Sequence, residues 1–257
     1  PTMPLSANGF EAWITIDDHE AQPFQPETVD EPSGQTCWIA SELDKGFSIH
    51  CKNTDVSCQA VSRIGLDGIE CPGEILLGPN REAKVSGRRT TATAVHPFIF
   101  SRVNMTDDDA FLDSTAHTDV GHIRVEIWTI NVTGNKLYPE DVAPPMESKV
   151  HERSKKGVAH QIKFGEPVVG NSRSAATYDY LETFPLVTFV FKYRSIDILR
   201  ANGLAPPLVA GKRKAHDDSV KQEDKGPKRL KKESRQPGEI IDLTRSETLV
   251  TAEVIDL

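Results

Sequence analysis

The chain has 257 residues, of which 37% are hydrophobic and 7% aromatic, and its formal net charge at pH 7 is −8. Residues 211–236 contain ten Lys or Arg and five Asp or Glu, whereas the rest of the chain contains 20 basic and 33 acidic residues. An acidic body is poorly suited to binding nucleic acid over a whole face, so any such contact should come from the basic tail.

The cysteines and the apolar runs exclude two further classes of protein. Four cysteines, separated by 13, 6 and 12 residues, form no C-x-x-C pair, so we expect buried, reduced thiols rather than a zinc site or disulfides. No apolar run approaches the ~20 residues of a membrane-spanning helix, and no apolar signal segment lies near the start of the sequence. The sequence therefore predicts neither secretion nor a membrane span.

Alternation of apolar and polar residues predicts short strands along the first 200 residues. The predicted strands cover residues 10–16, 37–40, 47–51, 59–64, 95–103, 123–130, 158–164 and 186–193. A turn at residues 44–46 separates the second strand from the third in the manner of a hairpin. Trp13, Trp38 and Trp128 fall at alternating apolar positions, which favours core packing.

One short helix is predicted after the last strand, where Ser195 can cap its start and Gly203 its end. Eight to ten short strands with turns between them predict an all-β fold, an antiparallel β-sandwich or jelly-roll-like domain. We expect this domain to cover residues 7–204 and a tail to cover residues 205–257.

Several segments of the body also resemble a known family. They are Cys37-Trp38-Ile39, Pro97-Phe98-Ile99-Phe100-Ser101, Val150-His151-Glu152-Arg153-Ser154-Lys155-Lys156, and Phe191-Lys192-Tyr193-Arg194-Ser195 followed by Leu199 and Gly203. In this order they resemble uncharacterised proteins of basidiomycete fungi that carry one domain of unknown function, often before a low-complexity tail. The resemblance covers about residues 7–205. It implies a fungal origin and a single β-rich domain, and it implies no activity.

The body shows no catalytic or metal-binding motif that we recognise. His151-Glu152 lacks the second histidine of a metalloprotease, because Lys155 occupies that position. The acidic segment 107–113 lacks the glycine of a calcium-binding EF-hand loop. We therefore predict no catalytic residue, metal or cofactor. An enzyme or ligand site assembled from distant strands stays an alternative, which a pocket with converging histidine and carboxylate side chains would favour.

The composition changes after Leu204, and almost no apolar residues follow until residue 239. Such a segment cannot offset its ordering entropy by burial, so we expect it to be disordered. Two basic clusters at near-bipartite spacing predict a nuclear import signal and hence a nuclear location. Their basic residues are Lys212, Arg213, Lys214, Lys228, Arg229, Lys231 and Lys232.

Two aliphatic segments near the C-terminus resemble SUMO-interacting motifs. An isolated aliphatic strand on a polar tail can complete itself by adding to an exposed sheet edge of a partner. The predicted SUMO-binding residues are Ile240, Ile241, Asp242, Leu243, Val254, Ile255, Asp256 and Leu257. Val220-Lys221-Gln222-Glu223 fits the pattern of a SUMO acceptor, which makes Lys221 a candidate for modification. Extra strands of the domain, or a helix over residues 249–257, are the structural alternatives for the aliphatic segments.

The sequence thus predicts a non-enzymatic nuclear adaptor whose tail binds SUMO or SUMO-modified proteins and an import receptor. The β domain would recognise a partner that the sequence does not identify. One alternative is a chromatin or nucleic-acid-associated protein that uses the basic tail, with weak and salt-dependent binding. The other is an enzyme or ligand-binding sandwich.

Overall fold

The computed structural model of the chain describes residues 3–30, 33–107, 119–138, 150–151 and 159–208. The chain divides into two compact units, Pro1–Val209 and Ala210–Leu257. All described residues belong to the first unit, and everything below concerns that unit. No helix in its described part is long and apolar enough to cross a membrane.

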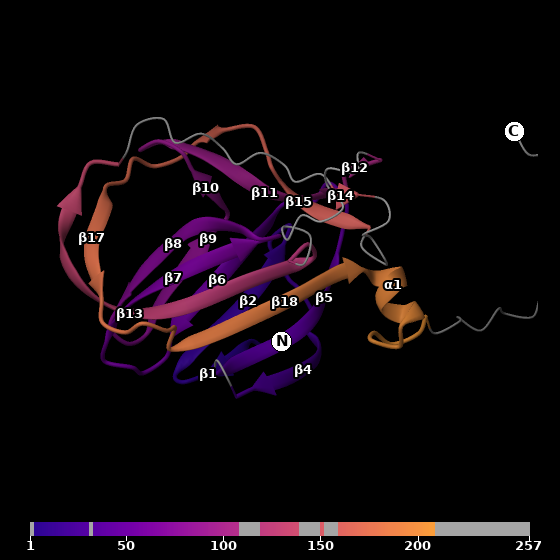
Figure 1. Ribbon diagram of the computed structural model, residues 1–257, viewed down its shortest axis with the longest axis horizontal. Helices are drawn as coiled ribbons and strands as arrows, with labels where there is room; N and C mark the ends of the chain where they lie inside the picture. Colours follow the sequence, from indigo (N-terminus) through magenta and orange to yellow (C-terminus); the bar gives the residue numbers. More distant parts are fainter. Residues whose placement is uncertain (1–2, 31–32, 108–118, 139–149, 152–158, 209–257) are drawn as a thin grey trace, which may run out of the picture. The chain divides into compact units, whose positions relative to one another are not determined.

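The larger of the two main sheets has seven strands in the order β4-β5-β18-β13-β7-β8, and β17 pairs with the second half of β13 (Figure 1). All neighbours are antiparallel except β5 and β18, which run parallel. The strands are β4 (Phe24–Val29), β5 (Gly34–Ser41), β7 (Gln59–Leu66), β8 (Ile69–Leu77), β13 (His122–Lys136), β17 (Ala175–Tyr180) and β18 (Val187–Ser195).

The second main sheet has five strands in the order β1-β2-β6-β9, with β3 paired to β2. Its strands are β1 (Leu5–Ala7), β2 (Phe10–Ile16), β3 (His19–Glu20), β6 (Phe47–Asn53) and β9 (Arg81–Val85). Two small sheets complete the fold. They comprise β10 (Gly87–Arg89), β11 (Ala94–Arg102), β15 (His160–Phe164) and β16 (Val168–Val169), and the parallel pair β12 (Met105–Thr106) and β14 (Val150–His151).

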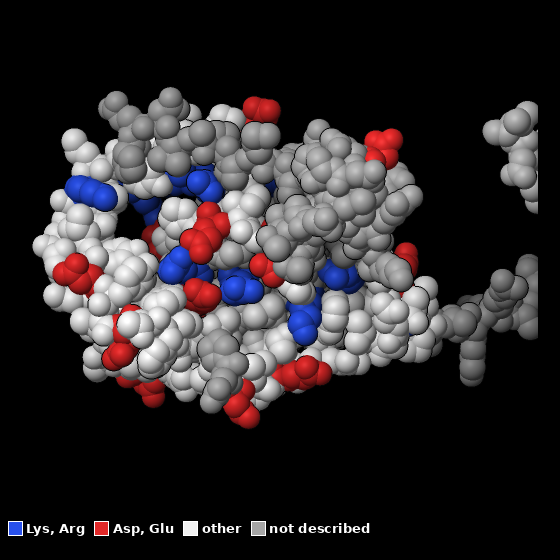
Figure 2. Space-filling model, viewed as in Figure 1, with Lys and Arg blue, Asp and Glu red and all other residues white. Residues whose placement is uncertain are grey.

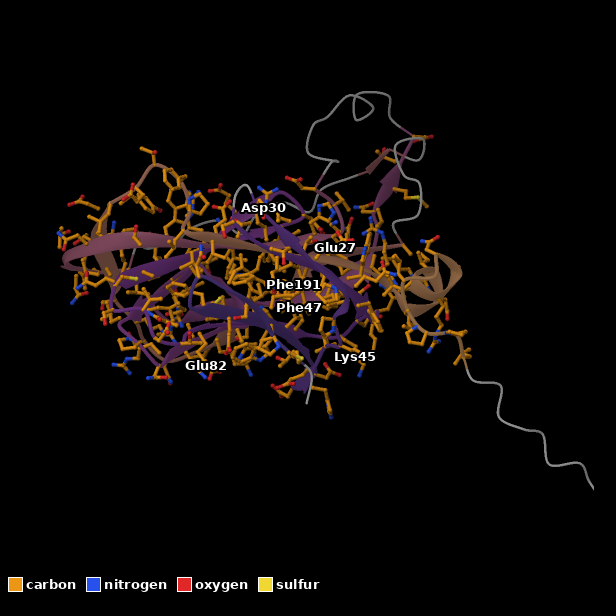
Figure 3. The ribbon with its side chains drawn as sticks, turned by 90° about the horizontal axis from the view of Figure 1, so that it is seen from below. Glu27, Asp30, Lys45, Phe47, Glu82 and Phe191 are labelled. Atoms are coloured by element: carbon orange, nitrogen blue, oxygen red, sulfur yellow. The ribbon has the colours of Figure 1, made fainter. Side chains whose placement is uncertain are left out.

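Apolar side chains from the inner faces of both main sheets form one core. Phe47 of β6 stacks on Phe98 and Phe100 of β11, with ring centroids 5.5 and 4.5 Å apart, and Phe100 contacts Tyr193 of β18 at 5.0 Å. This aromatic row links three sheets, and its packing adds to the burial of apolar area. Figure 3 shows Phe47 and Phe191 together in the interior, with Lys45 and Glu82 at the periphery.

Two-residue turns fix the register of three hairpins. Asn8-Gly9 joins β1 to β2, Asp17-Asp18 joins β2 to β3, and Asp67-Gly68 joins β7 to β8. All six residues have positive φ, which a type I′ turn requires and which Asn, Asp and Gly adopt most readily. The sequence therefore places left-handed residues where the strand twist needs them.

The structure confirms a predominantly β-stranded, sandwich-like fold with one short helix, α1 (Ile196–Ala201), near the end of the domain. Ser195 occupies the N-cap position but forms no side-chain capping bond, and the C-cap is Asn202. Gly203 follows with a φ of 69°. The predicted position of the N-cap is confirmed without a capping bond from Ser195, whereas the helix ends at Asn202, one residue before the predicted Gly203.

Two expectations about the strands were wrong. Residues 44–46 do not form a hairpin, because β5 lies in the seven-stranded sheet and β6 in the five-stranded one. The three tryptophans do not belong to the core either. Trp13, Trp38 and Trp128 are half-buried on outward-facing positions, while their neighbours, such as Ala12, Ile39 and Ile127, point inward. Alternation predicts that each strand has two faces, and these three tryptophans lie on the outer one.

Candidate functional site

The residues predicted for SUMO binding, nuclear import and SUMO attachment lie outside the described residues. They are Ile240, Ile241, Asp242, Leu243, Val254, Ile255, Asp256 and Leu257, then Lys212, Arg213, Lys214, Lys228, Arg229, Lys231 and Lys232, and finally Lys221. These assignments stay predictions. The structure instead describes two side-chain clusters on the folded domain, one on the outer face of each main sheet.

The first cluster centres on Trp38, on the outer face of the seven-stranded sheet. Lys192 Nζ and Arg194 Cζ each lie 5.5 Å from the centroid of the Trp38 ring. Lys192 pairs with Trp38 in the β5–β18 register, and Arg194 is two residues further along β18 on the same face. Both cations lie within the range of attraction to the negative face of an aromatic ring. We call Trp38, Lys192 and Arg194 the cation–tryptophan site.

His122 extends the row onto β13, where it pairs with Lys192. Burial lowers the pKa of His122, and the nearby Arg194, Lys192 and Arg124 lower it further, against an opposing effect of Asp119. Burial first, and the neighbouring cations second, thus disfavour protonation of this imidazole. The cationic side chains of Lys192, Arg194 and Arg124 thus lie around His122.

Arg194 is held in place by a glycine turn. Its Nη1 donates to the carbonyl oxygens of Tyr193, at 2.6 Å, and Gly121, at 3.4 Å. Gly121 has a φ of 90°, and a Cβ there would lie 1.9 Å from Nη1 of Arg194. Only glycine gives both the left-handed backbone and the space for the guanidinium group.

Asp67 holds the same turn from the interior of the domain, where the residue is 3% exposed. The carboxylate accepts hydrogen bonds from the Gly121 amide, the Ile162 amide and the Tyr193 hydroxyl, all at 2.7 Å. Burial raises the pKa of Asp67 to about 6, although these donors lower it. Asp67 therefore ties β7, β15 and β18 to the turn before β13.

The charges on this face are unevenly balanced. Arg63 is paired with Glu70 at 2.7 Å and Arg124 with Asp119 at 3.8 Å. Within the described ranges, Lys192 and Arg194 have no carboxylate within 4.0 Å. Figure 2 shows basic residues across the middle of the side on which β13 and β18 lie, with acidic residues among them.

A shallow hollow of about 160 Å³ lies beside this site. Its lining includes His122, Arg124, Arg63 and Gly65, together with acidic side chains. Gly65 contributes no side chain to the surface between Arg63 and Arg124, which opens the hollow. The opposing charges along its wall suit a polar segment of a partner better than an apolar ligand.

The second cluster lies on the outer face of the five-stranded sheet. His50 Nε2 lies 3.1 Å from Thr15 Oγ1, and His50 Nδ1 lies 3.4 Å from a carboxylate oxygen of Glu82. The imidazole stacks on Trp13, with ring centroids 5.0 Å apart and an interplanar angle of 13°. Trp13 and Glu82 line a pocket of about 180 Å³, which also includes Lys52. A hydroxyl beside an imidazole, which in turn lies beside a carboxylate, is the arrangement in which an imidazole activates a hydroxyl as a nucleophile.

The four cysteines, Cys37, Cys51, Cys58 and Cys71, are free thiols, and all but Cys58 are buried. Burial raises the pKa of both Cys37 and Cys51 to about 12 and that of Cys71 to about 11, so these thiols stay protonated and unreactive. Across the part of the chain that the structure describes, no group of three or more His, Cys, Asp or Glu is arranged to hold a metal ion.

Sequence reasoning missed both clusters. Trp38 and Lys192 are 154 residues apart and meet only because β5 pairs with β18. Thr15, His50 and Glu82 come from three strands that are joined only in the folded sheet. The Asp67-Gly68 pair between two alternating runs was a usable hairpin signal. It could have located the Asp67 turn, although not its bonds to Tyr193 and Gly121.

Comparison with models of protein families gives a match over most of the domain. The family model described as Domain of unknown function (DUF7918) matches residues 9–207. This confirms the predicted single domain of unknown function, whereas the fungal origin stays a prediction. No curated protein and no solved structure matches the chain.

Proposed function

This chain belongs to the DUF7918 family, and we propose that it is a non-enzymatic nuclear adaptor. Its tail would bind SUMO or SUMO-modified proteins, and its β domain would bind a second partner. The basic clusters at residues 212–214 and 228–232 would deliver it to the nucleus.

The observation that carries this proposal is the repeated aliphatic motif. Ile240-Ile241-Asp242-Leu243 and Val254-Ile255-Asp256-Leu257 share the same order of apolar and acidic residues, each after a glutamate. Main-chain hydrogen bonds to a sheet edge would supply affinity, and the acidic residues would meet basic groups at the rim of the groove. Two such motifs on one tail raise avidity for a SUMO chain by ~10²-fold or more if both engage.

The folded domain supports an adaptor role through its surface. The cation–tryptophan site combines Trp and Arg, residue types that are enriched among the dominant contacts of protein interfaces. The adjacent hollow is shallow and lined by opposing charges. These features suit recognition of a polar partner segment.

The test is a titration of isotope-labelled SUMO with the full chain, followed by NMR. We expect shifts along one sheet edge of SUMO. These shifts should become weaker when Ile240, Ile241 and Leu243 are all changed to Ala, and they should vanish when Val254, Ile255 and Leu257 are changed to Ala as well. The matched control changes Leu249, Val250 and Leu204 to Ala, which removes three apolar side chains outside the motifs. The absence of shifts with the wild-type chain would refute the SUMO-binding claim.

A second candidate function is hydrolysis at the Thr15–His50–Glu82 cluster. It is favoured by the position of His50 between Thr15 Oγ1 and a carboxylate oxygen of Glu82, since this geometry lets the imidazole accept a proton from the hydroxyl. In that reaction, Thr15 Oγ1 would attack an ester carbonyl while His50 takes up its proton, and Glu82 would orient the imidazole. The imidazolium would then give this proton to the departing alcohol, and a water molecule deprotonated by His50 would release the acid and restore the Thr15 hydroxyl.

Hydrolysis of p-nitrophenyl acetate tests this candidate. If the cluster is catalytic, the wild-type chain should hydrolyse this ester faster than free imidazole does at equal concentration. This excess rate should be lost in both Thr15→Val and His50→Gln. His122→Gln, which removes a half-buried histidine from the other sheet, is the control. Equal rates in wild type, His50→Gln and His122→Gln would exclude catalysis by this cluster.

A further inference from the structure

The cation–tryptophan site carries two positive charges that the described part of the domain does not neutralise. Lys192 and Arg194 contact one aromatic ring from positions two residues apart on one face of β18, whereas Arg63 and Arg124 on the same face each have a carboxylate partner. Both side chains are only half-buried. Two neighbouring cations that have no carboxylate partner among the described residues, and that are partly shielded from water, favour binding of an anion.

The size of that charge identifies the kind of anion. A phosphomonoester on serine or threonine carries about −1.5 to −2 at pH 7, which matches Lys192 and Arg194 together, whereas one carboxylate would leave a positive charge unmatched. The fork of Arg194 can donate two parallel hydrogen bonds to phosphate oxygens, and Lys192 adds a point charge. We infer that the cation–tryptophan site binds a phosphoserine or phosphothreonine of a partner protein.

The surroundings favour a peptide over a nucleic acid. Asp119, Glu126 and Glu70 line the hollow beside the site and would repel the successive phosphates of a nucleic-acid backbone. A peptide presents one phosphate and can place neutral or basic residues beside these carboxylates. Trp38 offers an apolar surface for the residue next to the phosphate, as aromatic residues do at interface hot spots.

The site is preorganised for this role. Gly121 makes room for the guanidinium of Arg194, and the Gly121 and Tyr193 carbonyl oxygens fix its position. Asp67 in turn holds Gly121 and Tyr193. Because Arg194 is positioned before binding, less of its side-chain entropy is lost when the anion arrives.

The inference rests on the proposed adaptor role in one respect, that the domain has a protein partner. The probes are mixtures of short fluorescent peptides with random sequence around a central phosphoserine, serine or glutamate. Fluorescence anisotropy with the full chain should show the phosphoserine mixture binding at least about tenfold more tightly than the other two mixtures.

Charge reversal locates the binding. Lys192→Glu should weaken binding of the phosphoserine mixture about tenfold or more, while Arg194→Lys, which keeps the charge and loses the fork, should weaken it several-fold. Lys84→Glu makes the same charge change on the five-stranded sheet and should alter affinity less than about twofold. Circular dichroism and thermal unfolding verify that each variant is folded.

Three results would overturn the inference: equal binding of the glutamate and phosphoserine mixtures, no binding of any mixture, or equal weakening by Lys192→Glu and Lys84→Glu. The triple Ala variant at Ile240, Ile241 and Leu243 should bind the phosphoserine mixture like wild type. A failure of SUMO binding is thereby distinguished from a failure of the phosphopeptide site.

Discussion

Asp67 is an ionisable group in the core because the turn that contains it meets three other segments there. Backbone amides of Gly121 and Ile162 and the hydroxyl of Tyr193 all need an acceptor, and one carboxylate satisfies them. An amide or alcohol at this position offers fewer acceptor sites. The cost is desolvation of a charge, which is why the pKa of Asp67 rises to about 6.

This cost predicts a pH dependence of stability. The pKa of Asp67 is 3.8 when unfolded and about 6 when folded, so the folded state binds the proton more tightly. The contribution of Asp67 is therefore fully present below pH 4 and is lost as the pH rises to 6, by about 3 kcal/mol. Denaturant unfolding of wild type and Asp67→Asn from pH 4 to 7 should show this loss in wild type alone.

Asp67→Asn should also be less stable than wild type at every pH, because its amide nitrogen would face a backbone N–H donor. The difference between the two pH profiles isolates Asp67, since all other groups titrate alike in both proteins. Parallel profiles would show that Asp67 keeps an ordinary pKa in the folded state.

Tyr193→Phe should lower the free energy of unfolding by about 1–3 kcal/mol, because it leaves the buried carboxylate of Asp67 with one donor fewer. Tyr193 is fully buried, and its hydroxyl donates to both oxygens of Asp67. Tyr178→Phe removes the hydroxyl of a half-buried tyrosine on β17 and is the matched control. If the two variants lose equal stability, the bond to Asp67 contributes nothing specific.

At the scale of elements, the parallel pairing of β5 and β18 builds the cation–tryptophan site. It begins where Gly34 lies against Thr188. A Cβ at Gly34 would lie 1.8 Å from the carbonyl oxygen of Thr188, so no larger residue fits there without separating the strands. The requirement for glycine comes from this close backbone approach and not from an unusual φ.

Gly34→Ala should destabilise the domain by about 1–3 kcal/mol and speed hydrogen exchange at the Thr188 amide, which donates to Ser33 at 2.9 Å. Gly65→Ala is the control within the same sheet, because a Cβ at Gly65 meets only an ordinary contact at 3.5 Å from Arg124. Similar protection of the Thr188 amide in wild type and Gly34→Ala would show that the strands tolerate the extra atom.

The long alternating strands were predictable because burial on one face imposes period two on their sequences. Residues 123–130 were predicted as a strand and lie in β13, and all but the first of the predicted residues 186–193 lie in β18. Strands with mostly exposed side chains, such as β4, lack this alternation and were missed. The outward position of Trp38 was missed for a different reason, since its neighbours Cys37 and Ile39 are also apolar and alternation alone cannot tell which face is inner.

At the scale of the whole molecule, we propose that the domain and the tail carry separable functions. The family match ends at residue 207, and the first compact unit ends at Val209. The charge asymmetry follows this division, since the basic clusters begin at Lys212. Changes in the tail should therefore redirect the protein in the cell without altering the stability of the domain.

Changing Lys228, Arg229, Lys231 and Lys232 to Ala should abolish nuclear accumulation of the chain fused to a fluorescent carrier too large to diffuse through nuclear pores. An import receptor reads basic side chains on an extended segment, and four of the seven predicted contacts would be lost. The thermal midpoint of the domain should stay unchanged. A control that changes Lys45, Lys52, Lys84 and Lys163 to Ala removes the same charge from the domain and should still accumulate in the nucleus. Loss of accumulation in both variants would mean that net charge, rather than this cluster, directs the protein.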